Sequence, residues 1–480
     1  MGDIANKSVK GTLWSMIERF ATMGVQLLCT LAIAHFILPD QFGLVGMISI
    51  FMAFSMVIID SGFSQALIRD QNVNQRDYSS VFYFNIFVGL CVYLIAYFSA
   101  PYISLFYNEP LLTPLIRVTF ISMVCLSFSV VQQARLFKEV NFATVSKISL
   151  ISAIISGICG IYTAYLFRNA WALIVQSVSS ACIRTCLFWF YGKWYPSLIF
   201  SLQSIKKYLI FSMNLLGTNM IASITDNLPN LLIGKYFNAS ALAYYTIPEK
   251  IQRSIAGTIS FSIHRVSYPI MVSFQNEQQQ LLEYSKKVVG MAFFIIAPLM
   301  LILAILSKPL ILILLSEDWI EVATYLKYLA IYGALYCFAD INLDILIVRG
   351  KTKKVFQIEI VRKIVFLICL IIGITATINV LLIMLVVYQL FNALFVSYFA
   401  EKEIGGNLLI LFHATIPTLC CLIPAGIVCS LITLLNLPNV LCVLLASCSL
   451  IGIYLLVAKL SNNCYFNFSY NNFKNIMSKS

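Results

Sequence analysis

Charged residues are scarce in this sequence of 480 residues. Asp, Glu, Lys and Arg make up 11% of it, whereas hydrophobic residues make up 60%. A soluble domain usually carries about 25% charged residues, because a surface in water needs solvated groups. The composition therefore excludes an ordinary soluble protein and indicates a chain whose apolar side chains face lipid.

Several chemical motifs are also absent. The sequence contains no GxxxxGK[ST] motif, which excludes ATP hydrolysis by a P-loop. It has 14 cysteines but no CxxC or Cys/His metal spacing, and nearly all of them, such as Cys29 and Cys125, lie inside apolar runs. We interpret them as small buried hydrophobic residues rather than disulfides or metal ligands. The first apolar run contains Glu18 and Arg19 without a cleavage site, so we expect it to remain as a membrane span rather than a signal peptide.

Long apolar runs fill most of the chain. A helix that crosses a bilayer needs about 20 mostly apolar residues. On this basis we predict an all-α integral membrane protein of about fourteen transmembrane helices. The predicted spans are residues 12–36, 42–67, 80–104, 115–135, 146–166, 171–191, 208–233, 241–268, 288–314, 321–347, 356–374, 378–399, 409–434 and 439–458. Because 288–314 contains two prolines, it is predicted either as one span or as a span followed by a short surface helix.

The net charge of +12 lies in short loops between the apolar runs, which excludes a nucleic-acid-binding patch and matches the positive-inside pattern. The loops at 136–147 and 349–354 are basic, whereas the opposite loops hold only Arg168, Lys235 and Lys308. The predicted location is therefore the inner membrane, multi-pass, with both termini in the cytoplasm. Residues 201–208 are predicted to form an amphipathic surface helix.

Two segments of the chain resemble each other. Residues 31–44 and 231–244 both end a helix, turn through a short polar loop and begin the next helix. We expect two lobes related as parallel repeats, with a substrate path between them. The predicted domains are an N-lobe of six helices at 1–200, a C-lobe of six helices at 201–402, and two further helices with a cytoplasmic tail at 403–480.

A set of short stretches carries a resemblance to a known family. They include GTLWSMIERF (11–20), LPDQFGLVGM (38–47), DSGFSQALIR (60–69), RDYSSVFYFNIFVGL (76–90), FSMNLLGTNM (211–220), NLLIGKYFNASALAYY (230–245) and RVSYPIMVSFQ (265–275). In this order the sequence resembles the polysaccharide-transport branch of the multidrug/oligosaccharidyl-lipid/polysaccharide (MOP) exporter superfamily, the Wzx-type O-antigen and capsule flippases. The resemblance covers roughly residues 1–400. The chain departs from it where members often have a basic residue and then an aspartate, and where this chain has Asp226 and Pro229.

The resemblance implies a transporter with two lobes and alternating access, not an enzyme. Its substrate would be an undecaprenyl-diphosphate-linked oligosaccharide, moved from the cytoplasmic to the periplasmic leaflet. It implies no cofactor, but coupling to Na⁺, H⁺ or the membrane potential. The expected partners are the lipid-linked oligosaccharide, membrane lipids and other glycan-assembly proteins, with a monomer as the expected oligomeric state.

Charges inside the predicted spans are the candidate site residues, because a charge facing lipid is costly and an anionic headgroup needs cations to cross. In span 241–268, Glu249, Lys250 and Arg253 share one helix face. They form either an anion-binding cluster or a structural ion pair. The other cation candidates, each with interface snorkelling as the alternative, are Arg184, Arg117, Lys327 and Arg19.

The acidic candidates for coupling are Asp60, Asp226, Asp340 and Asp344. Asp340 and Asp344 lie four residues apart on one helix face, so two carboxylates could share a proton there. The alternative is that they pair with Arg349, Arg362 or Lys363. His264 has no second ligand in its neighbourhood of the sequence and indicates little on its own.

Two other functions compete with a flippase. A drug/cation antiporter of the same superfamily would have acids rather than arginines in its cavity. A membrane enzyme such as an O-antigen polymerase or ligase usually carries a long periplasmic loop, and no outer loop predicted here reaches about 15 residues.

Overall fold

The computed structural model describes residues 20–406, 409–435 and 437–467. Within these ranges every regular element is a helix, which confirms the predicted all-α class. Ten helical stretches of this described part are long and apolar enough to cross a membrane, or up to eleven if a bent pair counts as one span. Apart from short breaks, each of the predicted spans lies on helix wherever the structure describes it. The exact number of fourteen is not confirmed.

The chain divides into two compact units, Met1–Thr246 and Ile247–Ser480. The predicted lobe boundaries at 200 and 402 stay predictions. After an apolar helix at Phe20–Phe36, unit 1 contains α2 (Pro39–Asp60), α3 (Phe63–Arg69), α4 (Gln75–Tyr107), α5 (Leu112–Thr119), α6 (Ile121–Ser127), α7 (Val130–Lys138), α8 (Phe142–Phe167), α9 (Trp171–Gly192), α10 (Leu202–Tyr236) and the start of α11 (Ala239–Gln252).

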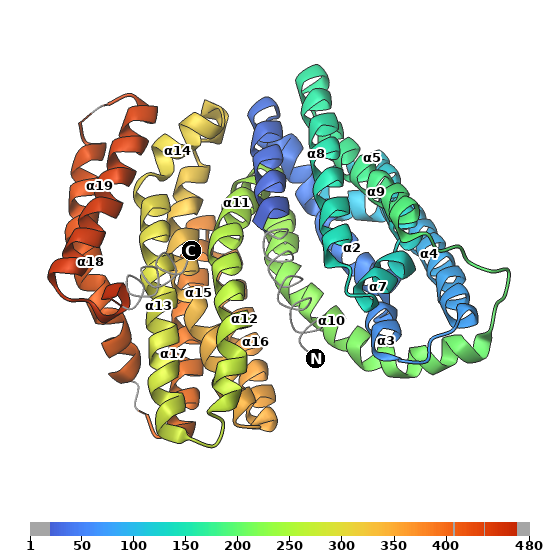
Figure 1. Ribbon diagram of the computed structural model, residues 1–480. Helices are drawn as coiled ribbons and strands as arrows, with labels where there is room; N and C mark the ends of the chain where they lie inside the picture. The colour runs from blue at the N-terminus through green and yellow to red at the C-terminus, as the bar shows by residue number, and fades with distance from the viewer. Residues whose placement is uncertain (1–19, 407–408, 436, 468–480) are drawn as a thin grey trace. The chain divides into compact units, whose positions relative to one another are not determined.

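Unit 2 begins within α11 and contains a π-helix, η1 (Arg253–Gly257), followed by α12 (Thr258–Ser273), α13 (Gln278–Ile305), α14 (Ser307–Leu314), a 3-10 turn η2 (Glu317–Trp319), α15 (Val322–Val348), α16 (Thr352–Thr375), α17 (Ile378–Glu403), α18 (Leu409–Thr433) and α19 (Asn439–Leu460). Its apolar core is built mainly from α13, α15 and α17, and α18 packs against both α13 and α19 (Figure 1).

A close approach in unit 1 depends on a glycine. A Cβ added to Gly43 on α2 would lie 1.8 Å from the carbonyl oxygen of Ala239, at the start of α11. The next glycine along α2, Gly46, faces Leu242. The two turns that resemble each other in sequence, 38–44 and 238–244, therefore pack directly against each other, because Gly43 has no side chain there.

The segment 288–314 is two helices. α13 contains Pro298 and ends at Ile305, and α14 starts at Ser307. Of the two alternatives that the sequence left open, the structure has the span followed by a short separate helix.

Helix α10 differs from the sequence-based expectation. We expected Pro229 to break the helix locally, but α10 continues through it to Tyr236. The bend, of 60°, instead separates Leu202–Ile210 from Leu215–Tyr236. A proline removes one hydrogen bond, and the helix continues where packing on α2 holds the two turns together. The predicted surface helix at 201–208 is the first arm of α10.

Candidate functional site

The run α11–η1–α12 carries the charge cluster predicted from the sequence. Arg253 and Glu249 form an ion pair with 3.3 Å between Nη2 and Oε1. The Glu249 side chain is 16% exposed and that of Arg253 is 57% exposed, so the cation stays accessible. Lys250, between them, is also exposed. The structure therefore has the ion pair of the structural alternative and, at the same time, two accessible cations for an anion.

Arg253 begins a π-helix, where each turn contains one extra residue. Pro248 lies inside α11, and the helix opens five residues later at Arg253–Gly257. π-turns leave backbone hydrogen bonds shifted and are frequent at functional sites. The charges of Arg253 and Glu249 act on the hydroxyl of Tyr332 on α15. The cluster thus lies beside a polar side chain of a second helix.

Polar side chains recur every four residues along α15. Tyr332, Tyr336, Asp340 and Asp344 form one stripe in unit 2, since residues four apart lie on the same face. The Tyr336 hydroxyl hydrogen-bonds to the Asp340 carboxylate, and the charges of Arg362 and Glu359 on α16 act on that carboxylate. A stripe of this kind within a candidate span gives unit 2 a polar interior face.

Asp344 has a partner that the sequence did not identify. Its Oδ2 atom lies 2.5 Å from Nδ1 of His264 on α12. Of the basic residues predicted as alternative partners, Arg349 donates to the carbonyl of Gln275 over 2.8 Å. Arg362 pairs with Glu359, and its charge also acts on Asp340. Helix spacing within one segment cannot reveal a contact between residues 80 positions apart.

The cation candidates of unit 1 have polar or aromatic partners. Arg184 donates to Oε1 of Gln133 over 3.3 Å, and its guanidinium lies 5.6 Å from the ring centre of Phe188. The Arg117 guanidinium lies 4.2 Å from the ring centre of Tyr97, a cation–π contact. Both cations are half-buried. Arg184 and Arg117 therefore remain candidates for binding an anionic headgroup.

The remaining candidates lie apart from these clusters. Lys327 on α15 and Asp226 on α10 are exposed, and Asp60 at the end of α2 accepts a hydrogen bond from Ser64. Arg19 lies outside the residues that the structure describes.

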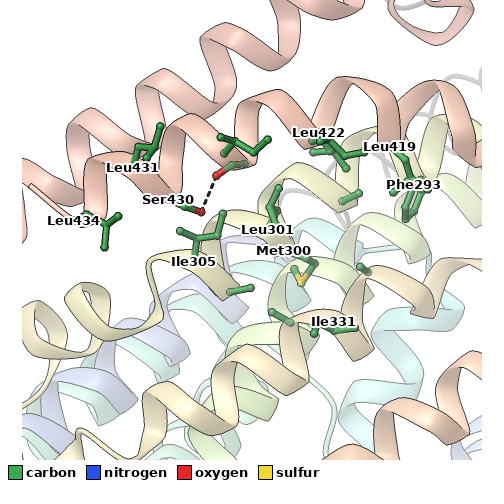
Figure 2. Close-up of a pocket in the computed structure, with 17 residues that line it drawn as sticks. Phe293, Met300, Leu301, Ile305, Ile331, Leu419, Leu422, Ser430, Leu431 and Leu434 are labelled. Atoms are coloured by element: carbon green, nitrogen blue, oxygen red, sulfur yellow. Dashed lines mark hydrogen bonds between the residues drawn. The ribbon is translucent and has the colours of Figure 1, made fainter.

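An apolar cavity of about 680 Å³ lies between α13, α15 and α18 in unit 2 (Figure 2). Its wall includes Phe293 and Met300 from α13, Ile331 from α15, and Leu422 from α18. The hydroxyl of Ser430 on the same wall donates to the carbonyl of Gly426 over 2.8 Å, so its proton is already bound. All three helices are candidate spans, and the cavity suits a hydrocarbon chain. No sequence pattern predicted it, because apolar residues fill every span.

In unit 1, a cluster of polar side chains joins the loop after α3 to the first arm of α10. Asp70 Oδ2 accepts hydrogen bonds from Nζ of Lys207 over 2.5 Å and from the hydroxyl of Tyr208 over 2.9 Å, both on the first arm of α10. The bond from Lys207, together with one from the backbone N–H of Asn72, lowers the pKa of Asp70 from 3.8 to about 2. The carboxylate therefore stays ionised and holds α10 against this loop.

Comparison with known proteins identifies the family. A family model described as "Polysaccharide biosynthesis protein" matches residues 32–324, more than half of the chain. The teichuronic acid biosynthesis protein TuaB of Bacillus subtilis (strain 168) is 24% identical over 358 residues, which cover 74% of each chain. The lipopolysaccharide biosynthesis protein WzxC of Escherichia coli (strain K12) is 23% identical over 438 residues, 88% of this chain and 89% of that protein.

Solved structures share the fold. The lipid II flippase MurJ in an inward closed conformation matches with a TM-score of 0.73 and 14% identity, over 94% of this chain and 98% of that chain. An inward-facing multidrug resistance transporter of the MATE family, in the MOP superfamily, matches with a TM-score of 0.62 and 13% identity, over 81% and 98%. The resemblance found in the sequence is confirmed: this multi-pass membrane protein has the MurJ/MATE fold and belongs to the polysaccharide biosynthesis protein family.

Proposed function

We propose that this chain is a flippase that moves an undecaprenyl-diphosphate-linked oligosaccharide from the cytoplasmic to the periplasmic leaflet by alternating access. Its family membership supports transport in polysaccharide biosynthesis. The relatives TuaB and WzxC are named for the biosynthesis of teichuronic acid and lipopolysaccharide, and MurJ for flipping lipid II. In this proposal the chain is a transporter, not an enzyme.

The observation that carries the proposal is that unit 2 contains separate places for the two chemically different parts of such a substrate. The cavity between α13, α15 and α18 is almost entirely apolar and lies within candidate spans. The exposed cations Lys250 and Arg253 lie elsewhere in the same unit. A lipid-linked sugar combines a long hydrocarbon tail with a diphosphate, and each needs its own surroundings.

In this mechanism Arg253 and Lys250 neutralise the diphosphate while it is out of water. An uncompensated anion cannot enter hydrocarbon at acceptable cost, whereas a guanidinium fork bonds two phosphate oxygens at once. The Glu249 carboxylate holds Arg253 in place while the substrate is absent. The tail stays in apolar surroundings throughout, so only the polar head changes sides. We further propose that an ion gradient, acting through the acids of α15, drives this exchange.

The test is to delete the gene in its own organism. The proposal predicts loss of the surface polysaccharide and accumulation of lipid-linked oligosaccharide that an impermeant oxidant such as periodate cannot reach in intact cells. Expression of the gene from a plasmid restores export. Accumulation of single repeat units on the outer face would instead favour a polymerase. Unchanged glycan with increased drug sensitivity would favour the antiporter.

A further inference from the structure

A histidine and a carboxylate join two helices of unit 2. Nδ1 of His264 on α12 lies 2.5 Å from Oδ2 of Asp344 on α15. The Asp344 side chain is only 5% exposed, whereas that of His264 is 44% exposed. The pair therefore has a buried carboxylate at one end and an imidazole edge open to the surroundings at the other.

This arrangement suits a proton better than a metal ion. Among the described residues, no group of three or more His, Cys, Asp and Glu side chains is placed to hold a metal. Imidazole is the side chain that ordinarily gains and loses a proton between pH 5 and 8. When Nδ1–H donates to Asp344, the other ring nitrogen, Nε2, can take a proton from hydronium. An N–H bond forms there and water leaves, so the pair changes from a net charge of −1 to zero.

Other charged side chains lie near this pair and are affected by its change of charge. The charged groups that act on Asp344 are His264 and Asp340. Asp340, one turn away, is in turn under the influence of Arg362 and Glu359 from α16. The tilted ring of Tyr268 on α12 lies 5.5 Å from that of His264.

Two further contacts of α15, one with α13 and one with α17, are formed by uncharged side chains. From α13, Phe293 packs on Phe338, and the amide of Asn342 donates to the hydroxyl of Ser397 on α17 over 2.8 Å. With the imidazole neutral, the charges of Asp340 and Asp344 repel each other, and Arg362 acts on Asp340. A proton on the imidazole relieves their repulsion.

We propose that His264 and Asp344 form a proton-binding site that couples proton movement to the transport cycle. The coupling role rests on the proposed flippase function, whereas proton binding does not. Before protonation the hydrogen bond between α12 and α15 already has an ionised acceptor. Protonation of the imidazole adds the attraction between two opposite charges and so strengthens this contact. His264 and Arg253 lie on one helical run, from η1 into α12. A change in the strength of the contact between α12 and α15 is therefore transmitted along this run to Arg253, which is proposed to bind the diphosphate.

The first test needs no substrate. The sequence has only three histidines, so protein labelled with ¹⁵N-histidine in lipid nanodiscs gives three imidazole signals. The signal absent from His264→Gln identifies this ring. In the wild type it is expected to change between the neutral and the charged form between pH 5 and 8, and Asp344→Asn is expected to alter the pH range of that change. His35 in unit 1 is the internal control, and its signal should be the same in both proteins. A His264 signal that is constant from pH 5 to 8, or unaffected by Asp344→Asn, overturns the proposal.

The second test separates this proposal from the flippase itself. Purified protein is reconstituted with undecaprenyl diphosphate carrying a fluorescent sugar, with and without a pH gradient. The gradient is expected to change the flipping rate of the wild type several-fold, and the ratio of the two rates is expected to fall to about one in His264→Gln and Asp344→Asn. Equal ratios in all three proteins overturn the proton site and leave the flippase intact. No flipping by the wild type overturns the proposed function, while the imidazole titration still decides the proton site.

Discussion

At the scale of single residues, Arg253 pairs with Glu249 and is proposed to bind the diphosphate, and substitution separates these two roles. Its guanidinium pairs with Glu249 yet is 57% exposed. We expect Arg253→Gln to lower glycan export at least about tenfold at unchanged protein abundance, because a charge-assisted hydrogen bond to an anion contributes roughly 1.5–3 kcal/mol. Arg253→Lys keeps the charge but loses the fork, so part of the export remains. Export assays with immunoblots of the membrane fraction measure both.

The matched control for Arg253 is the double variant Arg253→Gln with Glu249→Gln. If the arginine served only to neutralise Glu249, removing both charges would restore the folded protein and its export. Full export by Arg253→Gln together with Arg184→Gln, at wild-type abundance, would contradict a cationic headgroup site.

Asp70 lies outside the predicted spans, and its ionisation is expected to make the stability of the protein depend on pH. Its pKa is lowered to about 2 in the folded protein, below its ordinary value near 3.9, so its ionised form stabilises the fold. That contribution is complete above about pH 4 and is lost as the pH falls from about 4 to about 2. We therefore expect Asp70→Asn to lower the melting temperature at pH 7 in detergent, and the difference from the wild type to shrink below about pH 4.

The control for that prediction is Asp40→Asn, which removes a carboxylate from an exposed position of unit 1. It should lower the melting temperature less than Asp70→Asn does at pH 7, because an exposed carboxylate in the first turn of α2 contributes at most about 1 kcal/mol. A difference between Asp70→Asn and the wild type that is the same at pH 3 and pH 7 would show that Asp70 does not act through its charge.

The sequence predicted contacts between residues of one helix, because these follow from the spacing of the residues along that helix. The pair Glu249–Arg253 lies within one helical stretch, so its four-residue spacing was enough to predict it. The pair His264–Asp344 joins two helices, and no pattern within either segment indicates the contact. Asp340 and Asp344 were recognised as neighbours on one face, but the contact of His264 with Asp344 was not predicted.

At the scale of elements, Gly43 sets how closely α2 approaches the start of α11. Alanine there would place a Cβ 1.8 Å from a backbone oxygen, and backbone cannot move aside as a side-chain end can. We expect Gly43→Ala to destabilise unit 1 by about 1–3 kcal/mol, the usual range for overpacking. Thermal unfolding of the purified protein measures the change.

Gly24 provides the matched control, because it is also helical and an added Cβ there would have no described atom within 4 Å. Gly24→Ala should be neutral or stabilise the helix by up to about 1 kcal/mol, since alanine has the better helix propensity. Equal melting temperatures for the two variants would mean that α2 does not approach Ala239 as closely as the structure has it.

The apolar cavity between α13, α15 and α18 predicts the site of the lipid tail. Phenylalanine at Ala304 on its wall would fill part of the cavity. Excluding two methylene groups of a polyprenyl chain costs about 1.6 kcal/mol, which is roughly a tenfold loss in binding. Photo-crosslinking with a polyprenyl diphosphate that carries a diazirine in its tail should therefore decrease in Ala304→Phe.

Ile295 is on the same helix but outside the cavity, with a side chain 38% exposed, so Ile295→Phe is the control for added bulk on α13. Crosslinking that stays at the wild-type level in Ala304→Phe would place the tail elsewhere. Equal loss in both variants would point to a general effect on α13 rather than on the cavity.

The helices could be predicted from the sequence because lipid is the solvent around them. Runs of about 20 apolar residues located the helices, because a chain in hydrocarbon must satisfy its backbone within each helix. Local events inside those helices were predicted less well. Pro229 does not interrupt α10, and the opening near Pro248 takes the form of a π-helix at Arg253, because the packing of each helix decides which hydrogen bonds are lost.

At the scale of the whole molecule, the fold and the family followed from the sequence. The apolar runs predicted the fold, which is shared with a structure that is only 14% identical, and the short ordered motifs predicted the family. The orientation in the membrane, the repeat and the ion that drives transport stay predictions. The apolar cavity could not be predicted, because it depends on which apolar faces meet and not on how many there are.

We propose that this chain itself carries a lipid-linked sugar across a bilayer. The most direct measurement uses purified protein in liposomes that contain undecaprenyl diphosphate linked to a fluorescent sugar. An impermeant reductant then bleaches only the outer leaflet. If the protein is a flippase, bleaching is expected to proceed to near completion in liposomes with the protein and to stop at about half in protein-free liposomes, with Arg253→Gln close to the protein-free level. Bleaching that stops at half with the wild-type protein, under conditions where the protein is folded, would contradict it.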